Sequence, residues 1–166
     1  MKQMGSKLIL VLVEGPTDRD ALGLVFSRLA GEQAVVFDVL HTDLTAKEEL
    51  TAKYIEERME EEIRRYLHRN PFIRRQDIGK VVQLIDTDGA FVPADRVVQG
   101  QGETEYTEAC IFAKDRDRMI RRNISKRGIV YRLCRRQKTA GGYPFEMYYF
   151  SRNLEHVLHG EEAPLS

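Results

Sequence analysis

The stretch KLILVLVEGPTD, residues 7–18, decides the fold class of this chain. Its first seven residues are almost wholly aliphatic, as in a strand that is buried on both faces within a parallel sheet. A Gly-Pro pair then breaks the strand, and Thr17 with Asp20 resembles a helix-capping pair. Apolar residues at helical spacing follow, so the sequence predicts a strand, a turn and a helix over about 18–30.

The same alternation of strand and helix continues along the chain. The sequence predicts further strands over 34–40, 80–85 and 146–150, and a loop over 91–102. It also predicts a long charged helix up to about Arg69 and a basic helical region over 115–137 with a candidate break at Gly128. A last helix is expected to start within 153–159. Strands that alternate with helices indicate an α/β domain. We therefore expect one domain over residues 1–166, with a mainly parallel sheet of about four strands flanked by helices and an insertion or basic helical region at about 90–145.

Composition excludes several classes of protein. The 166 residues carry 26 basic and 26 acidic side chains, so a uniformly basic nucleic-acid coat is excluded. The longest apolar run, over 8–13, is too short to cross a bilayer, so we expect no membrane association. Cys110 and Cys134 have no paired spacing, which disfavours a disulfide framework and indicates a cytoplasmic location.

Basic charge is concentrated in residues 114–138, which contain eleven Lys or Arg and two Asp. One interpretation is a solvated helix face, and the other is a stripe that binds phosphates of a nucleic acid. The candidate phosphate-binding residues are Arg121, Arg122, Lys126, Arg127, Arg135 and Arg136.

Carboxylates follow two of the predicted strands. Glu14 comes directly after the first strand, and Asp86 and Asp88 come after the third. In an open parallel sheet the loops beyond the C-terminal strand ends form the ligand site, so these carboxylates are expected to converge. Like charges held together need a cation, and hard oxygen ligands suit Mg²⁺ or Mn²⁺. The plainer interpretation is that Glu14 stabilises a helix N-terminus and that the two aspartates form a turn.

The two carboxylate motifs, in this order, resemble those of the Toprim domain. VEGPTD, residues 13–18, is similar to its first motif, and LIDTDG, residues 84–89, is similar to its Asp-x-Asp motif. The first motif is closer to the versions in bacterial primases, ribosomal-RNA maturases and overcoming-lysogenization-defect nucleases than to those in topoisomerases. SRNLE, residues 151–155, also resembles the element that closes many nuclease-type Toprim domains.

The resemblance implies a Toprim, Rossmann-like fold and a Mg²⁺-dependent phosphodiesterase that acts on DNA or RNA. Glu14, Asp86 and Asp88 would be catalytic metal ligands, and Asp18 and Glu155 would help to hold a second ion. The metal would neutralise the scissile phosphate and generate hydroxide. The basic residues would follow the nucleic-acid backbone without reading bases.

Two other functions are consistent with the sequence. The chain could be a non-catalytic module that binds nucleic acid with the help of metal, beside a larger partner or as a homodimer. Its small size favours this, and so does the absence of any Lys after Lys138, since some Toprim nucleases carry a late Lys. A haloacid-dehalogenase-like phosphatase would use Asp86 as nucleophile and Asp88 as acid/base. That motif normally opens a chain, whereas here only 78 residues follow Asp88.

Overall fold

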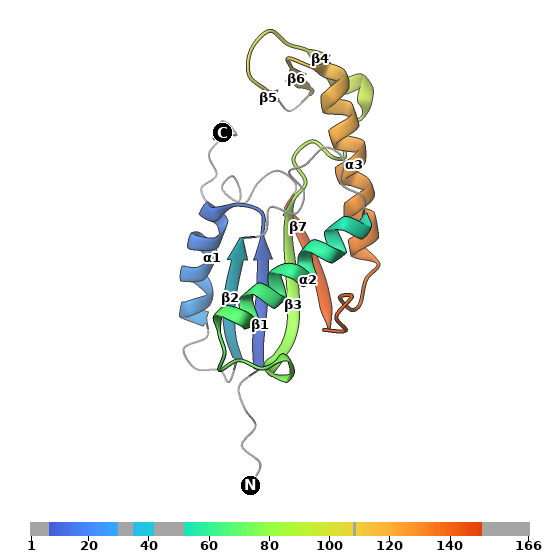
Figure 1. The fold of residues 1–166 in the computed structure, drawn as a ribbon. Coiled ribbons are helices and arrows are strands. Elements are labelled where there is room, and N and C mark those ends of the chain that lie inside the picture. Colours follow the sequence, from blue (N-terminus) through green and yellow to red (C-terminus); the bar gives the residue numbers. More distant parts are fainter. Residues whose placement is uncertain (1–6, 30–34, 42–51, 108, 151–166) are drawn as a thin grey trace.

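A parallel β-sheet forms the centre of the structure (Figure 1). The computed structural model describes residues 7–29, 35–41, 52–107 and 109–150. Within them the main sheet has the strand order β2-β1-β3-β7, and every neighbouring pair is parallel. The strands are β1 (Lys7–Val13), β2 (Val35–His41), β3 (Ile78–Asp86) and β7 (Phe145–Phe150). The predicted α/β class and parallel four-stranded sheet are therefore confirmed.

β1 lies inside the sheet because its side chains are apolar on both faces. Leu8, Leu10 and Leu12 belong to one hydrophobic cluster, whereas Val11 and Val13 belong to another. Successive side chains of a strand point to opposite faces, so the two clusters lie on the two sides of the sheet. Such a strand is stable only when helices cover both faces.

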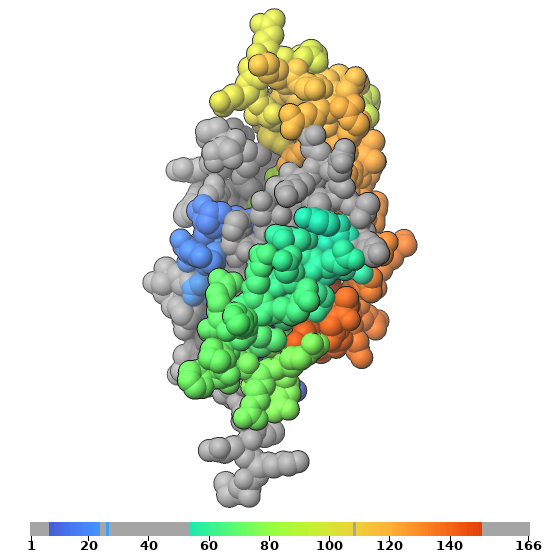
Figure 2. Space-filling model, viewed as in Figure 1, coloured from blue at the N-terminus to red at the C-terminus, as the bar shows by residue number. Residues whose placement is uncertain are grey.

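Helices cover the two faces unequally. α1 (Pro16–Leu29) packs Leu22 and Phe26 against the valine face of β1. α2 (Ala52–Arg69) and α3 (Arg116–Cys134) pack on the leucine face. In the space-filling view α2 lies across the front of the sheet and hides the strands behind it (Figure 2). The helix predicted up to about Arg69 is thus described from Ala52 onward.

The connections change direction between β1 and β3. β2 lies on one side of β1 and β3 on the other, so α1 and α2 cover opposite faces of the sheet. The carboxyl ends of β1 and β3 are neighbours at this point. In open α/β sheets such a switch point is where the crevice for a ligand forms.

A second, smaller sheet lies beside the first half of α3 (Figure 1). It consists of β4 (Val97–Gln99), β5 (Glu105–Tyr106) and β6 (Ile111–Ala113), in the order β4-β6-β5. The loop predicted over 91–102 therefore contains one short strand, β4, that the sequence did not indicate. Strands of two or three residues show no periodicity along the chain, and this sheet depends on contacts with α3 instead. A 3₁₀ turn (η3, Ala94–Arg96) leads into β4, and another (η2, Arg75–Asp77) leads into β3.

α3 runs without interruption through Gly128, which had been a candidate break. A glycine inside a helix costs about 1 kcal/mol relative to alanine. Ile129, Val130 and Leu133 are buried in the main core, and their packing offsets that cost. Within the described residues, no helix has the length and apolar character needed to cross a membrane. The helix predicted over 153–159 lies outside the described residues.

Candidate active site

The three predicted catalytic carboxylates lie at the switch point of the sheet. Glu14 directly follows β1, and Asp86 is the last residue of β3, the strand beside it. Asp88 lies in the turn that follows β3. The structure therefore brings together residues that are more than 70 positions apart in the sequence.

The turn after β3 is held in an unusual conformation. Asp88 has a φ of 45°, the only positive φ at a non-glycine residue in the described part of the chain. Thr87 fixes the turn to β7, since its backbone N–H and its Oγ1 donate to the Phe150 carbonyl oxygen over 3.0 and 2.7 Å. Left-handed backbone at a residue with a Cβ costs about 1–2 kcal/mol. Strain of this kind persists where the surrounding structure enforces it, and it is concentrated at functional sites.

Gly89 is required by close packing at the same turn. A Cβ at this position would collide with Cδ1 of Ile111 and would lie 3.0 Å from Nδ2 of Asn123. The Asp-x-Asp-Gly turn thus contacts both the small sheet and α3. The glycine of the motif therefore has a steric role, since side chains occupy the place of its Cβ.

α3 delivers two cations to the carboxylates. Lys126 Nζ donates to Asp88 Oδ2 over 2.7 Å and to Glu14 Oε2 over 3.2 Å. Arg122 Nη2 donates to the same Asp88 oxygen over 2.8 Å. Lys126 is only 3% exposed, so its ammonium group is an internal counter-charge of the site. Lys126 and Arg122 had been predicted to line a surface stripe, and the structure directs both toward Asp88.

Asp86 is the most perturbed group of the site. Burial raises the pKa of its carboxyl to about 7, helped by repulsion from Asp18, Glu14 and Asp88 and opposed by Lys126. The other three carboxylates are therefore close enough for their charges to act on Asp86. The Asp86 carboxylate has no hydrogen bond or ion pair with any other described residue. It is the acidic group that a further cation would stabilise most.

The carboxylates also raise the pKa of both cations, which favours the charged forms of Lys126 and Arg122. Burial alone would lower the pKa of Lys126, but Glu14 and Asp88 outweigh it and leave that pKa raised. Burial also opposes the charge of Arg122, whereas Tyr106 and Asp88 raise the pKa of its guanidinium above the usual range. Arg122 Nη1 donates to the Tyr106 hydroxyl over 3.3 Å. Both side chains are consequently charged at neutral pH.

Asp18 lies beside the cluster in the first turn of α1. Its Oδ2 accepts a hydrogen bond from the Gly15 backbone N–H over 3.1 Å, so it orders the turn that carries Glu14. Its charge also acts on Asp86, as the pKa of that group shows. Glu155, the other candidate ligand for a second ion, lies outside the described residues.

The remaining predicted phosphate-binding residues do not enter the carboxylate cluster. Arg121 and Arg135 are exposed and Arg127 is half-buried, and none of the three has an ion pair with another described residue. Arg136 pairs with Glu56 of α2, as Arg132 does over 3.2 Å. The six cations are thus divided between the carboxylate site, the surface of α3 and the α2–α3 contact.

The residues fit a divalent cation by their chemistry. Four carboxylates supply the hard oxygen donors that Mg²⁺ prefers, and Asp86 lacks a counter-charge of its own. Among the described residues, however, no three His, Cys, Asp or Glu side chains already form a metal-ligand set. Lys126 already pairs with Glu14 and Asp88 in this structure. A metal ion would therefore be held first by Asp86, with Glu14 and Asp18, whose charges act on Asp86, as further donors.

Asn123 is a site residue that the motifs did not indicate. It lies on α3 between Arg122 and Lys126 and beside Gly89. Both polar atoms of its side chain are buried and have no hydrogen-bond partner among the described residues. The helical spacing of the sequence could have indicated Asn123, because Asn123, Lys126 and Val130 are three and four residues apart and so share one face of α3.

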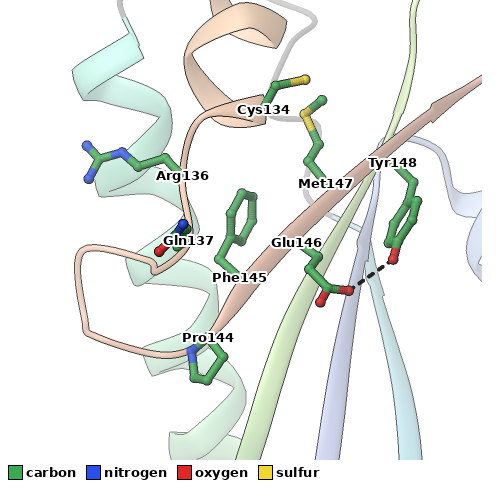
Figure 3. Close-up of a pocket in the computed structure, with 8 residues that line it drawn as sticks. All are labelled: Cys134, Arg136, Gln137, Pro144, Phe145, Glu146, Met147 and Tyr148. Atoms are coloured by element: carbon green, nitrogen blue, oxygen red, sulfur yellow. Dashed lines mark hydrogen bonds between the residues drawn. The ribbon is translucent and has the colours of Figure 1, made fainter.

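A shallow pocket of about 420 Å³ lies elsewhere, along β7 (Figure 3). It is lined by the end of α3, including Cys134, and by Phe145, Met147 and Tyr148 of the strand. The Tyr148 hydroxyl donates to Glu146 across its rim over 3.0 Å. None of the candidate catalytic carboxylates lines this pocket.

Comparison of the chain with family models, with curated proteins and with solved structures finds no match.

Proposed function

We propose that this chain is a Toprim-type domain that hydrolyses phosphodiester bonds of nucleic acid with the help of Mg²⁺ or Mn²⁺. The observation that supports this most is the Asp86 carboxylate, which lies among three other carboxylates at the switch point of a parallel sheet and has a pKa of about 7. A carboxylate in such a place is stabilised by a cation. The two strand-end motifs are those of the Toprim resemblance.

The residues of the chain divide the work between them. Asp86, Glu14 and Asp18 would hold the metal, which supplies a nucleophilic hydroxide and neutralises charge on the phosphate when bound. Lys126 and Arg122 fix the Asp88 carboxylate from the side of α3. Water adds to phosphorus, the bond from phosphorus to the leaving oxygen breaks, and that oxygen leaves as a hydroxyl group.

Three arginines on α3 or directly after it account for substrate binding in this proposal. Arg121, Arg127 and Arg135 carry positive charge that no described acidic residue neutralises. Phosphate contacts of this kind position the backbone and carry no sequence information. The natural substrate is therefore a nucleic acid bound without base-specific readout at these residues.

A second candidate is a binding module without catalysis. The ion pairs of Lys126 with Glu14 and Asp88 favour it, because they supply part of the charge balance that a metal ion would otherwise provide. The phosphatase alternative is less well supported. The Asp88 oxygen accepts hydrogen bonds from both Lys126 and Arg122, which leaves it poorly placed to donate a proton to a leaving group.

The test is a cleavage assay with end-labelled DNA and RNA oligonucleotides in Mg²⁺, Mn²⁺ or EDTA. We expect cleavage with either metal, none in EDTA, and at least about a hundredfold loss in Asp86→Asn and Glu14→Gln. Asp20→Asn is the matched control, since Asp20 is an exposed aspartate of α1 that pairs with Arg19. Metal-dependent binding without cleavage would support the second candidate instead.

A further inference from the structure

Two exposed aromatic rings lie next to the candidate active site. Phe91 is 42% exposed and Tyr131 is 55% exposed. Their ring centroids are 5.7 Å apart and the ring planes meet at 82°, an edge-to-face pair. Phe91 follows Asp88 by three residues, and Tyr131 lies on α3 little more than one turn beyond Lys126. Exposed rings that support each other in this way present an aromatic surface to solvent.

Tyr131 belongs to a continuous outer face of α3. Arg121, Ile124, Gly128, Tyr131 and Arg135 are spaced three and four residues apart, so they lie on one side of the helix, and all five are exposed. Apart from its chain neighbours and the backbone of its own helix, nothing lies within 4 Å of the place where a Cβ of Gly128 would be. The glycine therefore leaves open space on the helix face that carries Tyr131, where a flat group could lie.

The charge of this face indicates what kind of partner it fits. Arg121 and Arg135 lie at its two ends and Arg127 at its side, without an acidic partner in the described part of the chain. Aromatic rings interleaved with unpaired guanidinium groups match a single-stranded nucleic acid, whose bases stack while its phosphates bind cations. A duplex hides its base faces within the helix and fits less well. A neutral apolar protein surface would leave the arginines without counter-charges.

We infer that Phe91, Tyr131 and the open step at Gly128 form a platform on which unpaired bases of a single strand stack. The inference rests on the proposed function and specifies its substrate, because Phe91 ties the platform to the turn that carries Asp88, three residues before it. Stacking tolerates any base, since every base has a π-face. The shared chemistry is an unpaired base next to a phosphate, which both DNA and RNA supply.

The absence of tryptophan from the sequence allows a direct test. Tyr131→Trp introduces a single reporter, and Phe72→Trp is the control, because Phe72 is 95% exposed in the turn between α2 and β3. Oligothymidylate and oligouridylate of about 12 nucleotides, a duplex and an abasic strand of equal charge are titrated in EDTA at low salt. We expect single strands to quench the Tyr131→Trp fluorescence to saturation and to leave the Phe72→Trp fluorescence unchanged. A difference between oligothymidylate and oligouridylate identifies which nucleic acid the platform prefers.

Binding measured separately by anisotropy should weaken about five- to a hundredfold in Phe91→Ala and Tyr131→Ala, and for the abasic strand. Phe72→Ala should bind like the unmodified chain, and circular dichroism confirms that each variant is folded. Equal binding of abasic and normal strands, or no quenching at Tyr131→Trp, would overturn the inference. So would a shift of the Tyr131→Trp emission with protein concentration alone, since a second copy would then cover this face.

These measurements need no cleavage, so the two proposals fail separately. Quenching without metal-dependent cleavage would overturn the proposed hydrolysis and support the platform. Cleavage of single strands without quenching would support the hydrolysis and overturn the platform.

Discussion

Lys126 is the residue on which the charge balance of the site depends. Its ammonium lies within hydrogen-bonding distance of Asp88 and Glu14, and it is almost wholly buried. Removing one member of a buried charge group costs several kcal/mol, because the others keep their desolvation cost without compensation. Under the proposed function, Lys126 and a divalent cation would be alternative partners for the same carboxylates.

Lys126→Met should destabilise the fold by about 3 kcal/mol and make its stability depend on Mg²⁺. The methionine fills a similar volume but removes the ammonium group that Glu14 and Asp88 share, and Asp88 then keeps Arg122. Melting temperatures with and without Mg²⁺ measure the effect, and the rise on adding Mg²⁺ should be larger in the variant than in the unmodified chain. Lys114→Met, at an exposed lysine before α3, should behave like the unmodified chain. If Mg²⁺ raised the melting temperature equally in all three proteins, a divalent cation would not replace the charge of Lys126 at these carboxylates.

Asp86→Asn should increase stability at pH 8 in EDTA by about 1–3 kcal/mol and leave it unchanged at about pH 3. The pKa of Asp86 is about 7 in the folded chain and near 3.8 when the chain is unfolded. Between pH 3.8 and about pH 7 the folded chain therefore keeps a proton on Asp86 that the unfolded chain has lost. The stability of the unmodified chain therefore falls as pH rises from about 4 to about 7. Asp86→Asn has no carboxyl group at this position, so its stability should not fall in this way.

Urea unfolding at the two pH values measures the difference. Asp95→Asn, at an exposed aspartate of η3, controls for the loss of one negative charge. If Asp86→Asn and the unmodified chain show parallel pH dependence, Asp86 does not titrate as described.

At the scale of elements, α3 links the small sheet to the carboxylate site. Arg116, in its first turn, donates from Nε to the Val97 carbonyl over 2.8 Å and from Nη2 to the Ala94 carbonyl over 3.2 Å. Asp115 caps the helix by accepting from the Arg118 backbone N–H over 2.9 Å. These contacts hold β4 against the helix that carries Arg122 and Lys126.

Arg116→Ala should cost about 1–2 kcal/mol and loosen the small sheet selectively. Amide hydrogen exchange should become faster over β4 and β6, whereas β1 and β3 should stay protected because their core is untouched. Arg121→Ala, an exposed arginine on the same helix, serves as the control. Uniformly faster exchange through both sheets would show that Arg116 supports the whole domain.

The strands of the main sheet could be predicted from the sequence because their signals are local. The aliphatic run of β1 and the breaks at Gly15 and Gly89 are visible in the printed chain. The small sheet could not be predicted in this way, since β5 has two residues and is defined by its partners. The carboxylates of the two motifs were predicted to share a site, and their strands are neighbours.

The role of Lys126 was missed because basic residues occur all around α3. Treating residues 114–138 as one charged stripe ignored the phase of the helix. Ile129 and Val130 follow Lys126 by three and four residues and lie in the core, so the helix period places Lys126 on the inner face. Which groups it meets there depends on the packing of α3 against the sheet, and no single-sequence pattern records that.

At the scale of the whole molecule, each part of the fold serves one edge of the sheet. β1 and β3 present carboxylates at their carboxyl ends, and α3 supplies the opposing cations. Thr87 ties the turn after β3 to the end of β7. The outer face of α3 adds aromatic and basic side chains beside this edge. Under the proposed function, this arrangement would hold a divalent cation beside a phosphate chain.

The central claim is that a divalent cation binds at Asp86 and Glu14, and a crystal soaked in Mn²⁺ tests it most directly. An anomalous difference map locates Mn²⁺ without any assumption about activity. The account predicts a peak about 2.1 Å from a carboxylate oxygen of Asp86, shared with Glu14 and balanced by Lys126 at Asp88. A strong peak remote from both residues, or none at saturating Mn²⁺, would contradict it.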